Sequence, residues 1–387
     1  MITYVTKEGD VLDWIVWRHY GTISVLEKVM QANPNVTDEK IICWNRNKTS
    51  LYRNNSKNGR RNKIMELTPD FSISINGNGT FPKDRVISIR TTDEAGIVSD
   101  SCEIELDDFD GALQFPNTEA KIVVSLGYKE TGLTKIGTYY VKSISLDGAR
   151  HIIQIQCNAA PKSMRSQKTQ SNSGAISDKV SIMASNYKMD SAVSDEFDEI
   201  DLDDCPQFAE SDMNYLTRMS QKIGAVVKPV DDHLVVAKNM SGLSVSGENL
   251  PTKYLDASEV ASYSCDFRET ESGGFSGTVY ANWYEKETGE YHLEKVGEGD
   301  PETELQEIFP TQAQAITAAK AKFRRVTKSN KKFRFTTAGR TDLFAEGPLV
   351  LRGFYSKIPT NWIISRVEHR LSSYGFVTSV DCCIGDG

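Results

Sequence analysis

Closely spaced carboxylates are the first groups in this sequence that could bind a metal ion. Asp108, Asp110 and Gly111 match the centre of the calcium-binding loop of EF-hand proteins. The first and twelfth positions of such a loop would be Leu106 and Asn117, and neither is a suitable ligand. We therefore expect no calcium site here.

A second group of carboxylates lies between residues 195 and 204. These side chains could bind a cation, but a run of like charges is usually a solvated surface. We interpret this run as a solvated acidic loop, whose members are Asp195, Glu196, Asp198, Glu199, Asp201, Asp203 and Asp204.

Patterns for a nucleophile or a histidine site are equally weak. The segment 274–277 (GFSG) approaches the nucleophile elbow of hydrolases, but Thr278 stands where the last glycine is needed. The five histidines lack the spacing of a metal pair, and the seven cysteines contain no C-x-x-C motif. The sequence therefore predicts no catalytic residues, no bound metal and no cofactor.

The most regular pattern in the chain is an alternation of apolar and polar residues between residues 85 and 157. Cys102, Ile104 and Leu106 alternate with polar neighbours, which is typical of a strand with one buried face. Two more runs, at 122–126 and 153–157, repeat the alternation, with turn-forming residues between them. We interpret this region as an antiparallel sheet closed into a barrel.

A second region, 349–381, repeats this pattern. The segment 122–128 aligns with 348–354, because each contains a glycine followed by an aromatic residue at its end. Both regions finish on a strand that closes with a cysteine, Cys157 or Cys382. We interpret this as an internal repeat of one barrel, and the alternative is chance similarity between two hairpins.

The composition is that of a globular protein with several domains. The chain has 387 residues, of which 25% are charged, and a formal net charge of −8. This acidic balance argues against a protein that coats nucleic acid, but it allows DNA to pass along a surface that repels phosphate. Because the sequence shows neither a signal peptide nor an apolar run that could span a bilayer, we expect no membrane anchor.

The first 42 residues predict a short strand and two amphipathic helices. Gly9 and Asp10 precede a helix with Leu12 and Ile15 on one face, and a second helix ends at Asn33-Pro34. The pattern resembles the LysM fold, in particular the tail protein X of contractile-tailed phages. This resemblance implies a joint in a baseplate, whereas LysM modules in general bind peptidoglycan.

Residues 43–65 interrupt this resemblance, because they contain few apolar residues and many Asn, Lys, Arg and Ser. A LysM unit needs a second strand at this place. We predict a basic polar linker at 43–65, and the alternative is that residues 41–64 are an out-of-frame bridge that joins two overlapping genes, with Met65 as the start of the second.

Three later segments resemble one family of phage proteins. They are VISIRTTDEAG at 86–96, DSCEIELDD at 100–108 and LGYKETG at 126–132. Together they are similar to the late control D proteins, the tail hubs of contractile phages and relatives of the VgrG hub of type VI secretion. A capped helix expected at 211–224 resembles the helix between the two barrels of these hubs. In the same region we expect an exposed polar loop at 162–173, a helix at 176–187 and a small hairpin around Asp231-Asp232.

The resemblance implies a mainly β (α+β) fold with two hub-type antiparallel β-barrels. The expected domains are a LysM-like βαα segment (1–42), the linker (43–65), a first tube-like barrel (66–161), an intermediate α+β domain (162–255) and a second barrel (256–387) with an inserted helix at 311–327.

The resemblance also implies a structural function. A hub joins a six-fold tail tube to a three-fold spike, and two barrels in each chain of a homotrimer give a ring of pseudo-six-fold symmetry. The expected partners are the tail tube protein, a separate spike protein and the baseplate wedge proteins, while DNA passes through the lumen without specific binding. The expected location is the baseplate of the virion tail, after assembly in the host cytoplasm.

Aromatic residues at the barrel rims are the candidate interface residues, namely Phe109 and Phe115. The alternative function is a peptidoglycan-binding or cell-wall-degrading tail protein, led by the LysM-like segment. A lytic enzyme needs two carboxylates about 5–9 Å apart in a cleft, whereas a hub needs surfaces for other chains.

Overall fold

The computed structural model describes residues 67–96, 98–170, 174–200, 206–267, 277–300, 302–328 and 331–384. The predicted LysM-like segment at 1–42 and the predicted linker at 43–65 lie outside these residues. Within the described part of the chain, none of the helices combines the length and the apolar character that crossing a membrane requires.

Six antiparallel strands form the first structural unit, with the hydrogen-bonded order β1-β4-β5-β6-β3-β2. All six contribute side chains to one hydrophobic core, so the alternating sequence pattern buries one face of each strand. A short 3-10 turn, η1 (Lys83–Arg85), precedes β2. The strands are β1 (Pro69–Ile75), β2 (Val86–Glu94), β3 (Ser101–Asp107), β4 (Lys121–Tyr128), β5 (Gly132–Asp147) and β6 (Ile152–Asn158).

Six further strands form the second unit around a separate core. Their order is β12-β18-β19-β20-β17-β13, and only the β12–β18 pair is parallel. The strands are β12 (Lys253–Asp256), β13 (Val260–Phe267), β17 (Lys331–Ala338), β18 (Pro348–Arg352), β19 (Asn361–Ser372) and β20 (Gly375–Cys383), with η3 (Ala257–Glu259) before β13. The predicted mainly β fold is thus confirmed.

The two units have the same topology. If the strands of each unit are numbered from one to six along the chain, both units have the hydrogen-bonded order 1-4-5-6-3-2. Four of the five ladders are antiparallel in both units, and the exception is β1–β4, which is antiparallel where β12–β18 is parallel. β-bulges also recur: Lys142 in β5 and Ser365 in β19 are each skipped in the ladder to the following strand. The same holds for Ile87 in β2 and Ala261 in β13. These shared irregularities favour a true internal repeat over chance similarity of hairpins.

The predicted alignment of 122–128 with 348–354 is wrong by one residue. Ile122 faces Tyr139, and the equivalent partner of Trp362 is Leu349 rather than Pro348. Burial agrees, because Ile122 and Leu349 are both fully buried. Successive side chains of a strand point to opposite faces. An alignment shifted by one residue therefore matches buried positions of one strand with exposed positions of the other.

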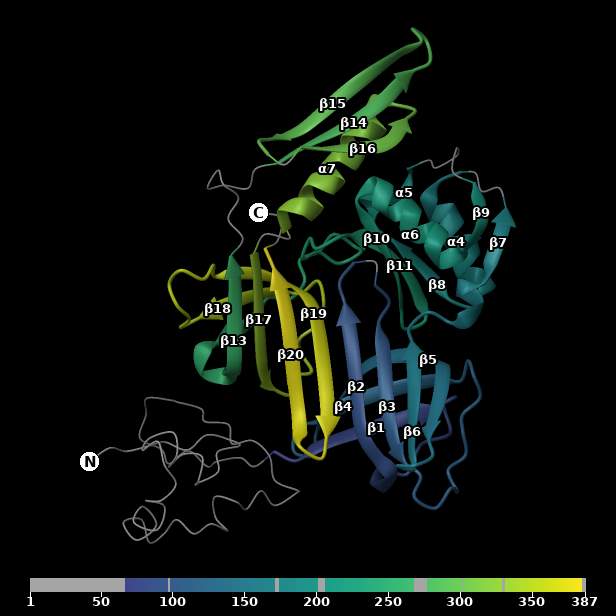
Figure 1. Cartoon of the computed structure of the whole chain (residues 1–387), viewed down its shortest axis with the longest axis vertical. Helices are drawn as coiled ribbons and strands as arrows, with labels where there is room; N and C mark the ends of the chain where they lie inside the picture. The colour runs from purple at the N-terminus through teal and green to yellow at the C-terminus, as the bar shows by residue number, and fades with distance from the viewer. Residues whose placement is uncertain are drawn as a thin grey trace, which may run out of the picture.

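A ladder between β2 and β19 joins the two units into one 12-stranded sheet. It pairs Arg366 with Glu94 at one end and Ser372 with Ser88 at the other. Figure 1 shows β17, β20, β19, β2 and β3 side by side in front, with β1 and β4 crossing behind. The sequence predicted two barrels but not this shared sheet.

The region between the units contains three helices and five strands in its described part. The predicted helices at 176–187 and after Ser211 are confirmed as α4 and α6, and the predicted hairpin around Asp231 is β10–β11. The loop predicted at 162–173 is wrong where it is described, because β7 pairs with β9. The elements are η2 (Lys162–Arg165), β7 (Gln167–Gln170), α4 (Ile176–Asn186), β8 (Asp190–Val193), α5 (Asp195–Asp198), β9 (Gln207–Ser211), α6 (Asp212–Ile223), β10 (Ala225–Val230) and β11 (His233–Lys238).

A protruding element interrupts the second unit between β13 and β17 (Figure 1). Its sheet has the order β15-β14-β16, and buried alanines of its helix pack on β14. It comprises β14 (Gly277–Glu285), β15 (Glu290–Glu298), β16 (Glu302–Phe309) and α7 (Gln312–Lys328), close to the helix predicted at 311–327.

Candidate assembly surfaces

The described residues contain no group of three or more His, Cys, Asp or Glu side chains placed to hold a metal ion. Asp108, from the rejected calcium pattern, is buried, and its carboxylate accepts a hydrogen bond from the Leu113 backbone N–H at 3.0 Å. His369 is buried beside the Thr378 hydroxyl, at 2.9 Å, and burial lowers its pKa to about 4. These side chains organise the fold locally.

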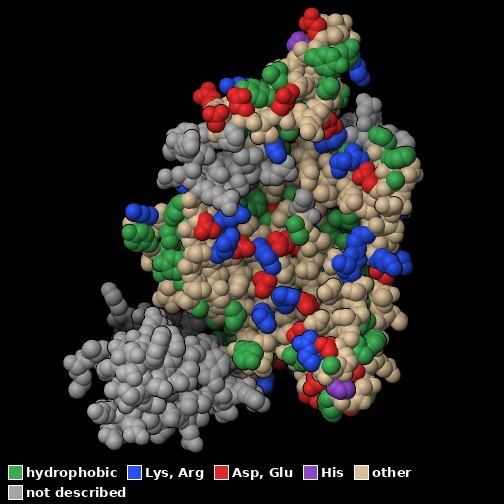
Figure 2. All heavy atoms as spheres, viewed as in Figure 1, with side chains coloured by type: hydrophobic (Ala, Val, Ile, Leu, Met, Phe, Trp, Pro, Cys, Tyr) green, Lys and Arg blue, Asp and Glu red, His purple; other side chains and the backbone are tan. Residues whose placement is uncertain are grey.

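The solvent-facing side of the joined sheet is covered by paired charges (Figure 2). Arg334 on β17 lies 3.4 Å from Asp266 on β13 and 3.3 Å from Asp381 on β20. Closer to the joint, Arg366 lies 3.2 Å from Glu94 and 2.9 Å from Glu368. Arg334 and Arg366 therefore each have a carboxylate on a neighbouring strand.

Paired polar groups continue across the first unit. Arg90 on β2 forms an ion pair with Glu103 on β3. Glu105 accepts hydrogen bonds from the Ser88 hydroxyl at 2.7 Å and from the Gln154 amide at 3.0 Å. These hydrogen bonds, led by that of Ser88, lower the pKa of Glu105 and keep it ionised. The face is thus highly polar without a large excess of either charge.

A shallow hollow of about 350 Å³ lies on this face where the two units meet. Its lining includes Arg90 and Glu103 from the first unit and Arg366 and Glu368 from the second. The sequence did not single out these residues, because the alternation marks them only as the exposed side of each strand.

A half-buried ion cluster fixes the intermediate region to both units. Lys228 on β10 lies 2.8 Å from Asp93 and 2.6 Å from Asp100, on either side of the β2–β3 connection. The other Asp93 oxygen accepts a hydrogen bond from the Ala345 backbone N–H, in the second unit, at 2.8 Å. Burial raises the pKa of Asp100 to about 7, with Asp93 adding to the rise and Lys228 opposing it. This cluster positions three parts of the chain.

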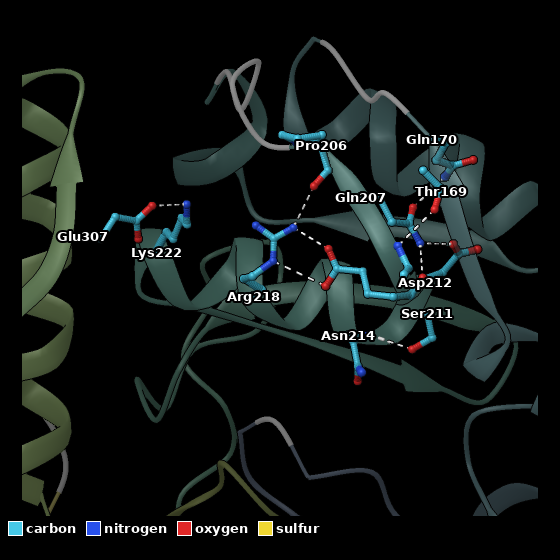
Figure 3. Close-up of polar contacts among 12 residues, drawn as sticks. Thr169, Gln170, Pro206, Gln207, Ser211, Asp212, Asn214, Arg218, Lys222 and Glu307 are labelled. Carbon is cyan, nitrogen blue, oxygen red and sulfur yellow. Dashed lines mark hydrogen bonds and ion pairs between the residues drawn. The ribbon is translucent and has the colours of Figure 1, made fainter.

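Helix α6 is held by a second polar network (Figure 3). It begins at Ser211, whose hydroxyl accepts the Asn214 N–H at 3.2 Å. The buried Asp212 carboxylate accepts hydrogen bonds from Gln207 at 2.9 Å and Lys168 at 2.7 Å. Burial alone raises the pKa of Asp212, but these hydrogen bonds outweigh it and the net shift is downward.

The far side of α6 approaches the protruding element. Lys222 donates a hydrogen bond to Glu307 of β16, at 2.5 Å, as Figure 3 shows. A hollow of about 750 Å³ lies beside this ion pair, and its walls come from α6, β16 and α7. Arg218 and Glu304 also line it, so the hollow is lined by both signs of charge.

The two predicted interface residues lie on the connection between β3 and β4, and both are exposed. Phe109 is 63% exposed, with the Arg85 guanidinium 3.9 Å from the centre of its ring. Phe115 is 52% exposed. Both side chains are therefore accessible to another protein.

The sequence missed another set of exposed apolar side chains, which lie at strand edges. Tyr263 and Phe267 on β13 are each 45% exposed, and Leu146 near the end of β5 is 54% exposed. Strand β13 is the last strand of the joined sheet. Alternation identified these segments as strands, but it does not reveal which strands lack a neighbour.

Comparisons with known proteins agree with this architecture. The model of the phage tail baseplate hub (GPD) family matches residues 180–375, just over half of the chain, and the model of phage tail protein X matches residues 2–43. A probable baseplate hub protein of Escherichia phage 186 is 28% identical over 81% of this chain and 92% of its own length.

Solved structures show the same fold. The 43 kDa tail protein of prophage MuSo2 from Shewanella oneidensis has a TM-score of 0.60 at 11% identity and covers 82% of this chain and 98% of its own. A component of the Escherichia coli type VI secretion system, described as structurally similar to T4 tail proteins gp27 and gp5, has a TM-score of 0.52 at 10% identity, over 81% of this chain and 77% of its own. The chain therefore belongs to the phage tail baseplate hub (GPD) family, and its function is that of a structural hub protein of the tail baseplate.

Proposed function

We propose that this hub protein assembles as a homotrimeric ring of pseudo-six-fold symmetry that joins a hexameric tail tube to a trimeric spike. The observation that carries the proposal is the repeated six-strand topology, including the matched bulges at Lys142 and Ser365. Three chains with two such units present six similar units, so three-fold and six-fold partners can both be matched.

The charged face of the joined sheet is the proposed wall of the ring's lumen. It carries paired charges such as Arg90 with Glu103 and Arg334 with Asp381. Phosphates gain little from cations that already have carboxylate partners, so DNA can pass this wall without being retained. The domain division at 66–161, 162–255 and 256–387 is part of the same proposal.

The proposed partners are the tail tube protein, a separate spike protein and the baseplate wedge proteins. Phe109 and Phe115 are proposed to contact one of them, because both are exposed on the same connection. Replacing each with serine should change the thermal midpoint little, because the rings are largely in solvent and Phe109 loses only an exposed contact with Arg85, and should weaken capture of the partner. Assembly is proposed to take place in the host cytoplasm.

We propose no catalytic step for this chain. The alternative, a peptidoglycan-binding or wall-degrading protein, is favoured only by the segment that matches tail protein X. Sedimentation with purified peptidoglycan distinguishes the two functions. The hub remains in the supernatant and leaves the sugar polymer intact, whereas a wall protein sediments with it or shortens it.

The decisive test of the ring is the mass of the purified chain in solution, measured by light scattering with and without the spike protein. One chain has a mass of 43.1 kDa. A particle of three times this mass supports the trimer, and a chain that stays monomeric under both conditions contradicts it.

A further inference from the structure

Two strand segments in the joined sheet have one side without a described partner. Strand β13 pairs only with β17. Strand β5 pairs with β4 over its first half and with β6 over its second half, so residues 143–147 have a neighbour on one side only. An open edge presents backbone N–H and C=O groups that can pair with another strand.

The internal repeat identifies the covered equivalents of these two edges. In the repeat, β13 corresponds to β2 and β5 corresponds to β19, as the shared bulges show. Within the chain, β2 and the second half of β19 pair with each other. The equivalent pairing, between β13 and the second half of β5, does not occur within one chain.

The two open edges cannot meet within one chain. Seven strand spacings separate β5 from β13 in the joined sheet, and each spacing is about 4.8 Å. Along the sheet the two edges are thus about 34 Å apart, and Figure 1 shows β13 and β5 on opposite sides of the molecule. Neither edge has a partner among the described residues, so another molecule can supply one.

We infer that β13 of one protomer pairs antiparallel with residues 143–147 of β5 in the next protomer. This inference rests on the proposed trimeric ring. The contact is heterologous, because one edge meets a different edge of the neighbour, and such contacts close into a ring when the rotation between neighbours is a whole fraction of a turn. Three chains would then share one continuous wall of strands around the lumen.

The intrachain ladder also gives the register of this contact. Val367 pairs with Asp93 and His369 pairs with Thr91 between β19 and β2. The shared bulges equate β5 with β19 and β13 with β2, residue by residue. The equivalent of the first pair is Ile144 opposite Phe267, and the equivalent of the second is Leu146 opposite Cys265. Asp147 then faces Ser264, and Ser145 faces Asp266, so no like charges oppose each other.

Exposure supports the transfer. Within the covered ladder, Ile89 on β2, which pairs with Leu371, and His369 on β19, which pairs with Thr91, are 0% and 3% exposed. Their equivalents at the open edges, Tyr263 and Leu146, are 45% and 54% exposed. Positions that are buried in the intrachain ladder are thus apolar and accessible where the ladder is missing. A second copy of the chain, rather than an unrelated protein, is the occupant that continues the same pattern.

A single substitution can test this contact. Leu146→Cys should form a disulfide with the native Cys265 of the neighbouring protomer under mild oxidation, because directly opposed residues in antiparallel strands have close Cβ atoms. Non-reducing electrophoresis should show covalent dimers and trimers that dissociate on reduction. The double variant L146C/C265S should show none, and L293C, on the exposed strand β15, is the matched control for a cysteine elsewhere.

The outcomes separate this inference from the proposed ring. If light scattering shows a trimer and L146C does not cross-link through Cys265, the pairing of β5 with β13 is wrong and the ring stands. A persistent monomer contradicts both. A second variant, L146K, should abolish the trimer, since it places a charge in the contact, whereas L293K should leave the trimer intact. An intact L146K trimer contradicts the contact.

Discussion

Glu119 and Glu346 occupy the same place in the two structural units. Both have left-handed backbone conformations, with φ of 74° and 69°. The Glu119 N–H donates to the Val141 carbonyl at 3.0 Å, and the Glu346 N–H donates to the Ile364 carbonyl at 2.8 Å. Such a conformation is unfavourable for residues other than glycine, so its occurrence at both sites indicates that the turn before β4 and β18 is a shared feature of the repeat.

The left-handed conformation at Glu119 predicts an order of stability among variants. Glu119→Ala keeps the backbone strain and loses the hydrogen bonds to the Lys162 N–H, at 3.0 and 3.1 Å. Glu119→Gly loses the same bonds but removes the strain, so it should be about 1 kcal/mol more stable than the alanine variant. Thermal unfolding of both variants tests this, and an alanine variant at least as stable as the glycine variant contradicts it.

Lys228 should be one of the most sensitive charged residues of the fold. Lys228→Met leaves two half-buried carboxylates, Asp93 and Asp100, without their shared cation. We expect a loss of about 3–5 kcal/mol, seen as a large drop in the thermal midpoint. Lys83→Met is the control, because its ion pair with Asp70 is largely exposed on the lysine side and should contribute less than about 1 kcal/mol. Equal effects of the two substitutions would contradict the role given to Lys228.

Asp100 predicts a pH dependence of stability. Its pKa is raised from 3.8 to about 7 by burial, so the folded state keeps this proton over a range in which the unfolded state has lost it. Its contribution to stability therefore falls as pH rises from about 4 through 7. His369, with its pKa lowered to about 4, acts in the opposite sense, adding stability as pH rises from about 4 to 6.5.

Asp100→Asn should remove the loss of folding stability that the titration of Asp100 causes as pH rises. We expect wild type to lose on the order of 1 kcal/mol more than D100N between pH 6 and pH 8, with the difference read from thermal midpoints at each pH. Asp84→Asn, on the exposed turn before β2, is the matched control and should keep the wild-type slope. Parallel slopes for wild type and D100N would rule out Asp100 as the titrating group.

Gly127 should not tolerate a side chain. A Cβ at this position would lie 2.2 Å from the carbonyl oxygen of Gly132, a backbone atom on the paired strand. Gly127→Ala should therefore cost about 1–3 kcal/mol through strand displacement. Gly148→Ala, where a Cβ would have no atom within 4 Å, should be close to neutral. Similar thermal midpoints for the two variants would refute this difference.

Local patterns in the sequence predicted individual elements well. Ser211 and Gly224 were expected to begin and end a helix, and the hydroxyl of Ser211 and the left-handed φ of Gly224 do so at α6. Alternation likewise located β3, β4 and β6, because a strand with one buried face has a period of two. In each case, the signal and the structure lie within a few residues of each other.

Features that depend on distant residues were not predictable in this way. The ion cluster joins Lys228 with Asp93 and Asp100, which lie more than a hundred positions earlier in the chain. Strands β7 and β9 are short and largely polar, so they lack the apolar alternation that marks a strand. The glycine motif also misled the alignment, because Gly127 permits a close backbone approach while Gly353 supplies a φ of 71°. The two glycines serve different physical needs.

The protruding element of β14–β16 and α7 lies between β13 and β17, where the first unit has only the short connection from β2 to β3. One copy of the repeated unit thus carries a large insertion at this connection, while both copies retain the strands that pair along the sheet. In a ring of three such chains, a bare position and a decorated position would alternate around the circumference. The inner wall would then present six-fold symmetry to a partner, while the outer surface presents three-fold symmetry. Mutations in the insertion could change outer partners without altering the channel.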